Sequence, residues 1–370
     1  MRAGDSKLEQ PAAAAPRAPL LSVRDLSVSF QTAAGTVRAV DGVSFDIFPG
    51  EMLALVGESG SGKSVTAMSI LRLIESQGGT IHSGEIRFEG RDVLGLEPAQ
   101  VRQIRGNRIG MIFQEPMSSM NPVYTLETQI AEPLTVHRGL SSARARLEVI
   151  RLLELVGMPS PERRVDEYPH QLSGGMRQRA MIAMALACRP SLLIADEPTT
   201  ALDVTVQAQI LELIGRLQGE LGMSVLMITH DLGVVATVAQ RALVMYAGRV
   251  VEQARVLPLF ENPRHPYTAG LFESLPRLHV GSGGETPRLR PIEGSVPDAL
   301  NFPPGCRFHP RCRYAFAPCP ERVPALRSSD AGDPERRAAC FHTEQHPTFR
   351  YLEPDQTGVA SGSPREPEAP

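Results

Sequence analysis

The sequence predicts an α/β fold built around a parallel sheet. Between about residues 50 and 240, apolar segments with strand character alternate with segments of helical periodicity. Two short, wholly apolar runs, 192–195 and 225–228, are typical of parallel strands that are buried on both faces. A third run, 52–56, leads into a glycine-rich loop, and a helical pattern over 65–74 follows it. These three observations place a parallel α/β core in the middle of the chain.

Further elements flank this core. Apolar alternation predicts strands over 21–30 and 37–47, the second around the turn dipeptide Asp41-Gly42. The remaining predicted elements, in chain order, are a strand over 109–113, a mostly helical region over 116–157 that is clearest at 143–156, a helix over 176–187 and a hairpin over 242–253 that turns at Ala247-Gly248.

The composition limits the classes of protein to which the chain can belong. The chain has 370 residues, of which 42% are hydrophobic and 21% charged, which is enough apolar material for a sizeable core. No apolar run approaches the roughly 18 residues of a membrane-spanning helix, and the first 20 residues lack the apolar core of a secretory signal. The net charge of −3 argues against nucleic acid as a partner. We therefore expect a cytoplasmic protein that does not itself cross a membrane.

The ends of the chain differ from its centre. Residues 1–20 are rich in Ala and Pro, and residues 346–370 are rich in Pro, Gly, Glu and Ser, so both are expected to be disordered tails. After residue 286 the chain becomes rich in proline and contains four of the five cysteines, which predicts a small, loop-rich appendage. There is no internal repeat, so the chain carries one copy of its α/β unit.

The glycine-rich loop fits the phosphate-loop (Walker A) pattern G-x-x-x-x-G-K-[ST]. Its glycines let successive N–H groups point at phosphate oxygens, and the following helix adds its positive end. Lys63 and Lys7 are the only lysines among 38 basic residues, which indicates that Lys63 stands where a compact point charge is needed. A chance match is expected in about one chain in a hundred of this length. The loop reads Gly57-Glu58-Ser59-Gly60-Ser61-Gly62-Lys63-Ser64.

A second acidic motif follows the apolar run 192–195. Asp196 is placed to hold Mg²⁺ through water, and Glu197 is placed to orient and deprotonate an attacking water molecule. Alone, such a pair more often begins a helix or forms a solvated turn. Together with the phosphate loop, it indicates nucleotide hydrolysis.

A third motif carries a resemblance to a family. Leu172-Ser173-Gly174-Gly175-Met176-Arg177-Gln178-Arg179 resembles the signature sequence of ATP-binding cassette (ABC) ATPases. Gln114 matches the Q-loop of that family, Pro198-Thr199-Thr200-Ala201-Leu202-Asp203 matches the D-loop, and His230 matches the switch histidine. The resemblance implies a P-loop ABC-type nucleotide-binding domain over 21–255, with an antiparallel β subdomain and a helical subdomain at about 116–175.

The resemblance also implies roles for these residues. In this family two cassettes pack head to tail around two ATP molecules, so Ser173 would bind the γ-phosphate held by the partner's loop. Glu197, His230 and Gln114 are the implied catalytic residues, and Phe30 matches the aromatic residue that stacks on adenine. The implied Mg²⁺ contacts are Ser64, Gln114 and Asp196. The implied ATP contacts are Phe30, Gly57, Glu58, Ser59, Gly60, Ser61, Gly62, Lys63, Ser64, Val65, Ser173, Gly174, Gly175 and Asp203.

Two later segments narrow the resemblance. Asn262-Pro263-Arg264-His265-Pro266-Tyr267-Thr268 and Gly305-Cys306-Arg307-Phe308-His309-Pro310-Arg311-Cys312 resemble the C-terminal extension of ATPase subunits of the oligopeptide/dipeptide/nickel import family, here 256–345. The implied function is ATP hydrolysis that energises peptide import, with nickel or another small solute as the alternative. The implied location is peripheral, on the cytoplasmic face of a bacterial membrane. The implied partners are a second, similar ATPase that completes a heterodimer, two permease subunits that dock on 116–157, and an external solute-binding protein.

Other classes fit less well. A soluble ABC protein of DNA repair would need a long coiled coil between the phosphate loop and the signature, and the roughly 110 residues there leave no room for it. A translation-type ABC protein would carry two cassettes in one chain. A non-transport iron–sulfur enzyme would not explain the complete set of ATPase motifs.

The cysteines after residue 305 suggest a metal site. Cys306, Cys312, Cys319 and Cys340 have separations that suit zinc ribbons poorly, and a reducing compartment disfavours disulfides. A proline-rich segment of this kind, with little core of its own, is expected to need a cross-link such as a bound metal to order it. The resemblance implies a [4Fe–4S] cluster, because some members of the family carry one in this extension. Zinc and four unligated thiols are the alternatives.

Overall fold

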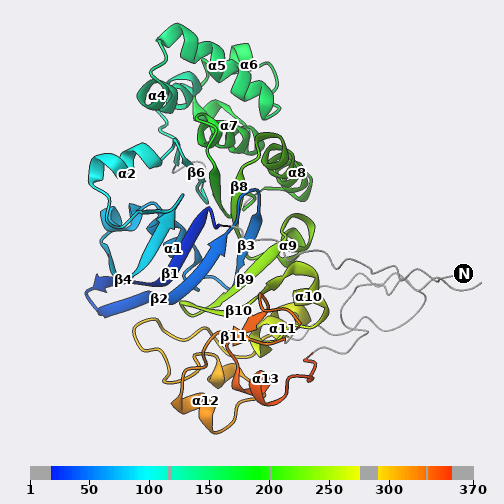
Figure 1. Cartoon of the computed structure of the whole chain (residues 1–370). Coiled ribbons are helices and arrows are strands. Elements are labelled where there is room, and N and C mark those ends of the chain that lie inside the picture. Colours follow the sequence, from blue (N-terminus) through cyan, green and yellow to red (C-terminus); the bar gives the residue numbers. More distant parts are fainter. Residues whose placement is uncertain (1–17, 116–118, 201, 276–290, 331, 352–370) are drawn as a thin grey trace, which may run out of the picture.

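The computed structural model of the chain describes residues 18–115, 119–200, 202–275, 291–330 and 332–351 (Figure 1). Most of the predicted disordered segments, 1–17 and 352–370, lies outside the described residues. The structure contains an eight-stranded sheet in the order β11-β12-β10-β9-β3-β8-β7-β6 and a four-stranded sheet in the order β2-β1-β4-β5. No helix in the described ranges is long and apolar enough to span a membrane.

The eight-stranded sheet contains the predicted parallel core. Strands β9, β3, β8, β7 and β6 are parallel, and β10 pairs with β9 as the predicted hairpin through Ala247-Gly248. The apolar runs of the sequence become fully buried strands, which confirms the α/β fold. The strands are β3 (Met52–Val56), β6 (Ile109–Ile112), β7 (Leu192–Asp196), β8 (Ser224–Thr229), β9 (Arg241–Tyr246), β10 (Arg249–Arg255), β11 (Arg327–Ser328) and β12 (Arg337–Ala338).

The four-stranded sheet is antiparallel and packs over one face of this core. It comprises β1 (Leu21–Thr32), β2 (Gly35–Ile47), β4 (Gly79–Phe88) and β5 (Arg91–Asp92). The dipeptide Asp41-Gly42 does not turn the chain. It lies inside β2, where the pairing with β1 shifts register and Gly42 has a φ of +70°. The turn-forming glycine is therefore used for a β-bulge.

Helices line the rest of the core. The helical lobe of α4, α5 and α6 lies at the opposite end of the molecule from α12 and α13 (Figure 1). Sequence analysis did not identify α8, although it buries Ile210, Ile214 and Leu217 on one face. The helices are α1 (Lys63–Ile70), η1 (Leu73–Gln77), α2 (Pro98–Ile104), α4 (Leu126–Arg138), α5 (Ser142–Leu155), α6 (Pro161–Arg164), η2 (Pro169–Gln171), α7 (Gly174–Leu186), α8 (Val204–Leu221), α9 (Leu232–Val238), α10 (Val256–Glu261), α11 (Pro266–Glu273), η3 (His309–Arg311), α12 (Pro318–Glu321) and α13 (Phe341–Gln345).

The residues after β10, which we call the C-terminal extension, continue the main sheet. Strand β12 pairs with β10, and β11 pairs with β12, so the extension adds two short strands to the edge. Residues 346–351 were expected to belong to a disordered tail. In the structure Tyr351 is buried, and the guanidinium group of Arg264 donates to the carbonyl oxygens of Pro347 and Phe349.

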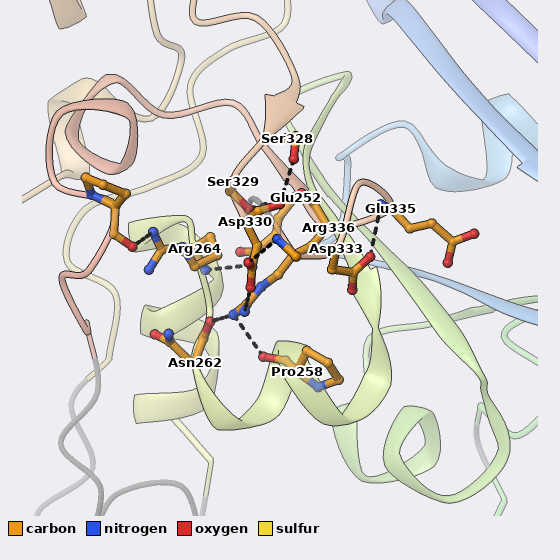
Figure 2. Close-up of polar contacts among 12 residues, drawn as sticks. Glu252, Pro258, Asn262, Arg264, Ser328, Ser329, Asp330, Asp333, Glu335 and Arg336 are labelled. Atoms are coloured by element: carbon orange, nitrogen blue, oxygen red, sulfur yellow. Dashed lines mark hydrogen bonds and ion pairs between the residues drawn. The ribbon is translucent and has the colours of Figure 1, made fainter. Parts of the chain in front are cut away.

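A buried glutamate of β10 anchors the start of the extension. The carboxyl group of Glu252 accepts hydrogen bonds from the backbone N–H groups of Arg264, at 2.6 Å, and His265, at 2.9 Å. Arg264 and Arg336 lie beside it in Figure 2, but Arg336 donates to the carbonyl oxygens of Pro258 and Asn262 instead. Because it is fully buried, Glu252 has a pKa raised to about 7.

This buried carboxyl group gives the protein a specific pH dependence. Between its ordinary pKa of 4.5 and a folded-state pKa of about 7, the unfolded chain loses the proton while the folded chain keeps it. The contribution of Glu252 to the free energy of unfolding should therefore fall by about 3 kcal/mol as the pH rises through that window. Glu252→Gln removes this contribution. The difference between the thermal unfolding midpoints of the variant and the wild type should therefore shift in favour of the variant as the pH rises from 5 to 8. A difference that does not change with pH would contradict the prediction.

Candidate nucleotide-binding site

The predicted phosphate loop connects β3 to α1 and packs tightly against its surroundings. Gly57 and Gly62 have φ angles of +152° and +99°. A Cβ atom on Gly57 would lie 2.2 Å from the carbonyl oxygen of Met245, and one on Gly62 would lie 2.4 Å from that of Ala39. The glycines are therefore required both by backbone conformation and by the close approach of β2 and the β9–β10 hairpin.

Lys63 lies inside the loop. Its Nζ donates to the carbonyl oxygens of Gly57, at 2.8 Å, and Glu58, at 3.0 Å, and the residue is 5% exposed. Burial lowers the pKa of Lys63, and the carboxylates of Glu197, Asp196 and Glu58 oppose that shift. The loop thus holds its one ammonium group against two of its own carbonyl oxygens.

Ser64 and Asp196 come together from different elements. The hydroxyl group of Ser64, in the first turn of α1, donates to Oδ1 of Asp196, at the end of β7, over 3.0 Å. Burial raises the pKa of Asp196, and the hydrogen bond from Ser64 opposes the rise. Mg²⁺ is commonly bound by one or two such oxygens together with water and substrate phosphates. These two side chains therefore fit a Mg²⁺ site.

Three side chains converge on Glu197. Its carboxylate accepts from Nε2 of Gln114 at 3.1 Å and from the hydroxyl group of Thr200 at 2.8 Å, and Nδ1 of His230 lies 3.3 Å away. Glu197 itself is in the left-handed region with a φ of +46°. Thr200 lies in the predicted D-loop but was given no role by the sequence analysis. The signal in the sequence that could have indicated this contact is the position of Thr200, three residues after Glu197.

The signature residues occupy the start of α7. The hydroxyl group of Ser173 caps this helix by accepting from the N–H group of Met176, and Ser173 is exposed to solvent. Asp203 caps α8 in the same way, accepting from the N–H group of Val206 at 2.9 Å. The side chain of Val206 also lies 3.0 Å from the position of a Cβ atom on Gly175. The starts of α7 and α8 therefore lie together and leave Ser173 open to solvent.

Phe30 lies near the end of β1 and is half-buried. Its ring approaches Gly79 of β4 closely, because a Cβ atom there would be 3.1 Å from the ring edge. The ring also packs against the core beneath the antiparallel sheet. Phe30 is thus partly a core residue, and only its outer part is available to a ligand.

The prediction of an iron–sulfur cluster is wrong. Within the described residues, which include all four late cysteines, no group of three or more Cys, His, Asp or Glu side chains is arranged to hold a metal ion. The cysteines do line a common cavity, but its volume is only about 20 Å³, close to that of one water molecule. Burial raises the pKa of the Cys306 thiol to about 11 and that of the Cys312 thiol to about 12. Cys306, Cys312, Cys319 and Cys340 are free thiols.

The physical reason is that the extension does not need a metal to order it. Strand β12 is hydrogen-bonded to β10, and Arg307 forms an ion pair with Asp41 of the antiparallel sheet. Arg311 forms an ion pair with Glu58 of the phosphate loop. Docking on the rest of the molecule replaces the metal staple that the proline-rich composition suggested.

Comparisons with known proteins match this architecture. The family described as ABC transporter matches residues 40–200, and the oligopeptide/dipeptide transporter C-terminal region matches 251–319. A putative peptide import ATP-binding protein of Brucella ovis is 54% identical over 321 residues, covering 84% of this chain and 94% of that protein. A probable peptide ABC transporter ATP-binding protein of Sinorhizobium fredii is 52% identical over 326 residues, covering 88% and 96%.

Solved structures show the same cassette. A dimeric ATP-binding cassette bound to ADP and phosphate superposes with a TM-score of 0.57 at 28% identity, covering 64% of this chain and 98% of that one. A cassette from Clostridium perfringens, part of an ABC transporter complex, gives 0.55 at 28% identity, covering 65% and 90%. The chain belongs to the ABC transporter ATP-binding proteins, in the group that carries the oligopeptide/dipeptide C-terminal region.

The packing of the loop glycines can be tested with a matched pair of variants. Gly60 and Gly62 both have positive φ, but a Cβ atom on Gly60 would meet nothing within 4 Å. Gly60→Ala should therefore cost about 1 kcal/mol of unfolding free energy, from backbone strain alone. Gly62→Ala should cost at least about 2 kcal/mol more, because the methyl group collides with the carbonyl oxygen of Ala39. Urea unfolding without nucleotide measures both, and equal losses would contradict the packing argument.

Proposed function

We propose that this chain hydrolyses ATP to energise the import of peptides, as one of two cassettes in a bacterial ABC importer. The observation that carries the proposal is the convergence of Gln114, Thr200 and His230 on Glu197. Lys63 and the Ser64–Asp196 pair lie at the same edge of the sheet. A purely structural role for one of these groups alone would not require all of them to meet.

The chemistry follows from this arrangement. The N–H groups from Gly60 to Ser64 and the start of α1 would bind the phosphates of ATP, and Lys63 would exchange its carbonyl partners for phosphate oxygens. A bound Mg²⁺, held by Ser64, Asp196 and Gln114, would neutralise charge on the phosphates. Glu197, oriented by Thr200 and His230, would accept the proton of the attacking water.

A second cassette would complete each site. Ser173 is exposed at the start of α7, a helix of 13 residues. Its hydroxyl group and the N–H groups of Gly174 and Gly175 can face a phosphate group from outside the chain. We propose that this partner is a homologous ATPase packed head to tail. The dimeric form of the structurally similar cassette supports pairing of this kind.

The proposed permease contact lies on the helical side. Val123 and Tyr124, just before α4, are 71% and 51% exposed, and Phe113, just after β6, is 36% exposed. Exposed apolar side chains suit an amphipathic partner helix, and Phe113 directly precedes Gln114 in the chain, so a helix bound there would be connected to the nucleotide site. We propose that two permease subunits dock here, which places the chain at the cytoplasmic face of the membrane, and that an external binding protein delivers the solute. Part of the predicted docking segment, 116–118, lies outside the described residues.

Peptide as the solute is inferred from the relatives. The curated relatives in Brucella ovis and Sinorhizobium fredii carry names that specify peptide import or a peptide transporter. The C-terminal region of this chain matches the oligopeptide/dipeptide group over 251–319. The uptake of labelled peptides by vesicles that contain the assembled transporter, with and without ATP, tests this part of the proposal.

The catalytic roles predict two different defects. Lys63→Ala should abolish ATP turnover by removing a phosphate contact, with weaker ATP binding. Glu197→Gln should keep ATP bound and slow hydrolysis at this site at least about 10²-fold, because the general base is lost. Single-turnover hydrolysis and nucleotide binding, with the partner's site silenced, separate the two. Turnover near the wild-type rate in Glu197→Gln would refute its role as the base.

The proposed pairing predicts that Ser173 acts on the other cassette. Ser173→Arg should leave nucleotide binding at this chain's own Lys63 unchanged and impair hydrolysis at the partner's loop. Photo-crosslinked nucleotide, quantified separately on the two subunits, reports both sites. A loss confined to this chain's own site would exclude the head-to-tail arrangement.

A further inference from the structure

We propose that the C-terminal extension sets the conformation of the phosphate loop, with Arg311 and Tyr267 as positioning residues for ATP binding. This inference rests on the proposed function, because it assumes that the loop Gly57–Ser64 binds ATP. Neither residue belongs to the phosphate loop or to the motifs of the cassette. Both act on the loop through one residue, Glu58.

Glu58 is held at three points. Its N–H group donates to the hydroxyl oxygen of Tyr267 at 2.9 Å, and its carboxylate accepts two hydrogen bonds from the guanidinium group of Arg311, at 2.9 and 3.2 Å. Its carbonyl oxygen accepts from Nζ of Lys63 at 3.0 Å. The extension therefore holds the N–H group and the side chain of Glu58 at the entry to the loop, while Lys63 holds its carbonyl oxygen.

Arg311 is itself rigidly placed. Its side chain is only 6% exposed, and Nε donates to the carbonyl oxygen of Glu293 at 3.0 Å. It also donates to the hydroxyl oxygen of Tyr246 at 3.3 Å and to the carbonyl oxygen of Ile292 at 3.4 Å. A guanidinium group with so many partners has little freedom to move, so it transmits the position of the extension to Glu58.

Tyr267 belongs to a buried aromatic cluster behind the loop. It is fully buried in α11, and its ring centre lies 4.6 Å from that of Tyr246 and 5.4 Å from that of Phe308. The cluster joins the end of β9 to the extension. The hydroxyl group of Tyr267 therefore meets the N–H group of Glu58 from a fixed position.

A second path supports the far side of the loop. Arg307 donates to the carbonyl oxygen of Ala247 at the hairpin turn, and its guanidinium group stacks on Phe302 at 4.0 Å. The next residue of the hairpin, Gly248, donates its N–H group to the carbonyl oxygen of Ser61 at 2.9 Å. The extension thus contacts the phosphate loop directly at Glu58 and indirectly at Ser61.

Two physical effects follow for ATP. Fixing Glu58 restricts the backbone of the loop before ATP arrives, so less conformational entropy is lost on binding. Arg311 also neutralises a carboxylate that would otherwise repel the phosphates of ATP. Removing Arg311 should therefore weaken nucleotide binding, although the guanidinium group contacts the side chain of Glu58 and not the N–H groups of the loop.

The test measures binding of a fluorescent ATP analogue to the full-length chain, together with steady-state hydrolysis by the assembled transporter. Arg311→Ala should raise the Kd for the nucleotide about tenfold, and Tyr267→Phe should raise it less. Arg311→Lys should restore part of the affinity. Glu58→Gln in the Arg311→Ala background should also restore part, because the unpaired carboxylate is gone. In hydrolysis, KM should rise by more than kcat falls, because these residues act on the loop and not on Glu197.

A neighbouring arginine provides the control. Arg313 lies two residues away in the same segment, is half-exposed and pairs with Glu273. Arg313→Ala should bind nucleotide like the wild type. Equal losses in Arg311→Ala and Arg313→Ala would overturn the inference, because the effect would then be general damage to the extension. Wild-type affinity in Arg311→Ala would also overturn it.

Two further results separate the inference from the proposed function. If the wild-type chain does not bind ATP, or if Lys63→Ala binds it equally well, the proposed function is refuted. The inference is then refuted as well, because it assumes that the loop binds ATP. If Arg311→Ala does not fold, Arg311→Lys and Tyr267→Phe decide the matter. Wild-type affinity and KM in both of those folded variants would refute positioning by the extension while leaving the proposed function intact.

Discussion

The alignment of parallel strands is the constraint on which the nucleotide site depends. Val56 of β3 pairs with Thr229 of β8, and Asp196 of β7 pairs with Ile228 of β8. The phosphate loop, the Asp196-Glu197 pair and His230 begin at these strand ends. Since neighbouring parallel strands end at the same edge, segments that are more than a hundred residues apart in sequence must meet there. A register shift of one residue in β8 would turn His230 away from Glu197 and break the site while preserving the sheet.

Much of this could be predicted from local sequence. The apolar runs at 52–56, 192–195 and 225–228 are strands because their residues suit burial on both faces, and the loop motif requires a strand before it and a helix after it. Residues whose role depends on a distant partner were harder to recognise. Thr200 contacts Glu197 across a turn in which the backbone of Glu197 adopts a left-handed conformation, and neither sequence pattern nor composition encodes that angle directly.

Local signals were also ambiguous where one pattern serves two structures. Asp41-Gly42 suits a turn, but it forms a bulge because both neighbouring segments continue along β1. The late cysteines illustrate the same difficulty on a larger scale. Their clustering was read as a metal site because the segment lacks the apolar periodicity of an independent core. Its order comes from contacts with β10, Asp41 and Glu58, which are between 80 and 270 residues away in sequence and cannot be seen in the segment itself.

The near absence of lysine has a related explanation in the structure. Arg307, Arg311 and Arg336 are largely buried, and each donates to oxygen atoms from at least two separate segments of the chain. A guanidinium group has five donors in a fixed plane and can join loops that have few backbone bonds of their own, whereas an ammonium group offers a single compact charge. Lys63 occupies the one described position where compactness matters, buried in the phosphate loop against the carbonyl oxygens of Gly57 and Glu58. The same chemistry therefore accounts for both the arginines that attach the extension and the lysine that the loop retains. It also brings the two kinds of cation together at Glu58, whose carboxylate faces Arg311 of the extension and whose carbonyl oxygen faces Lys63 of the loop.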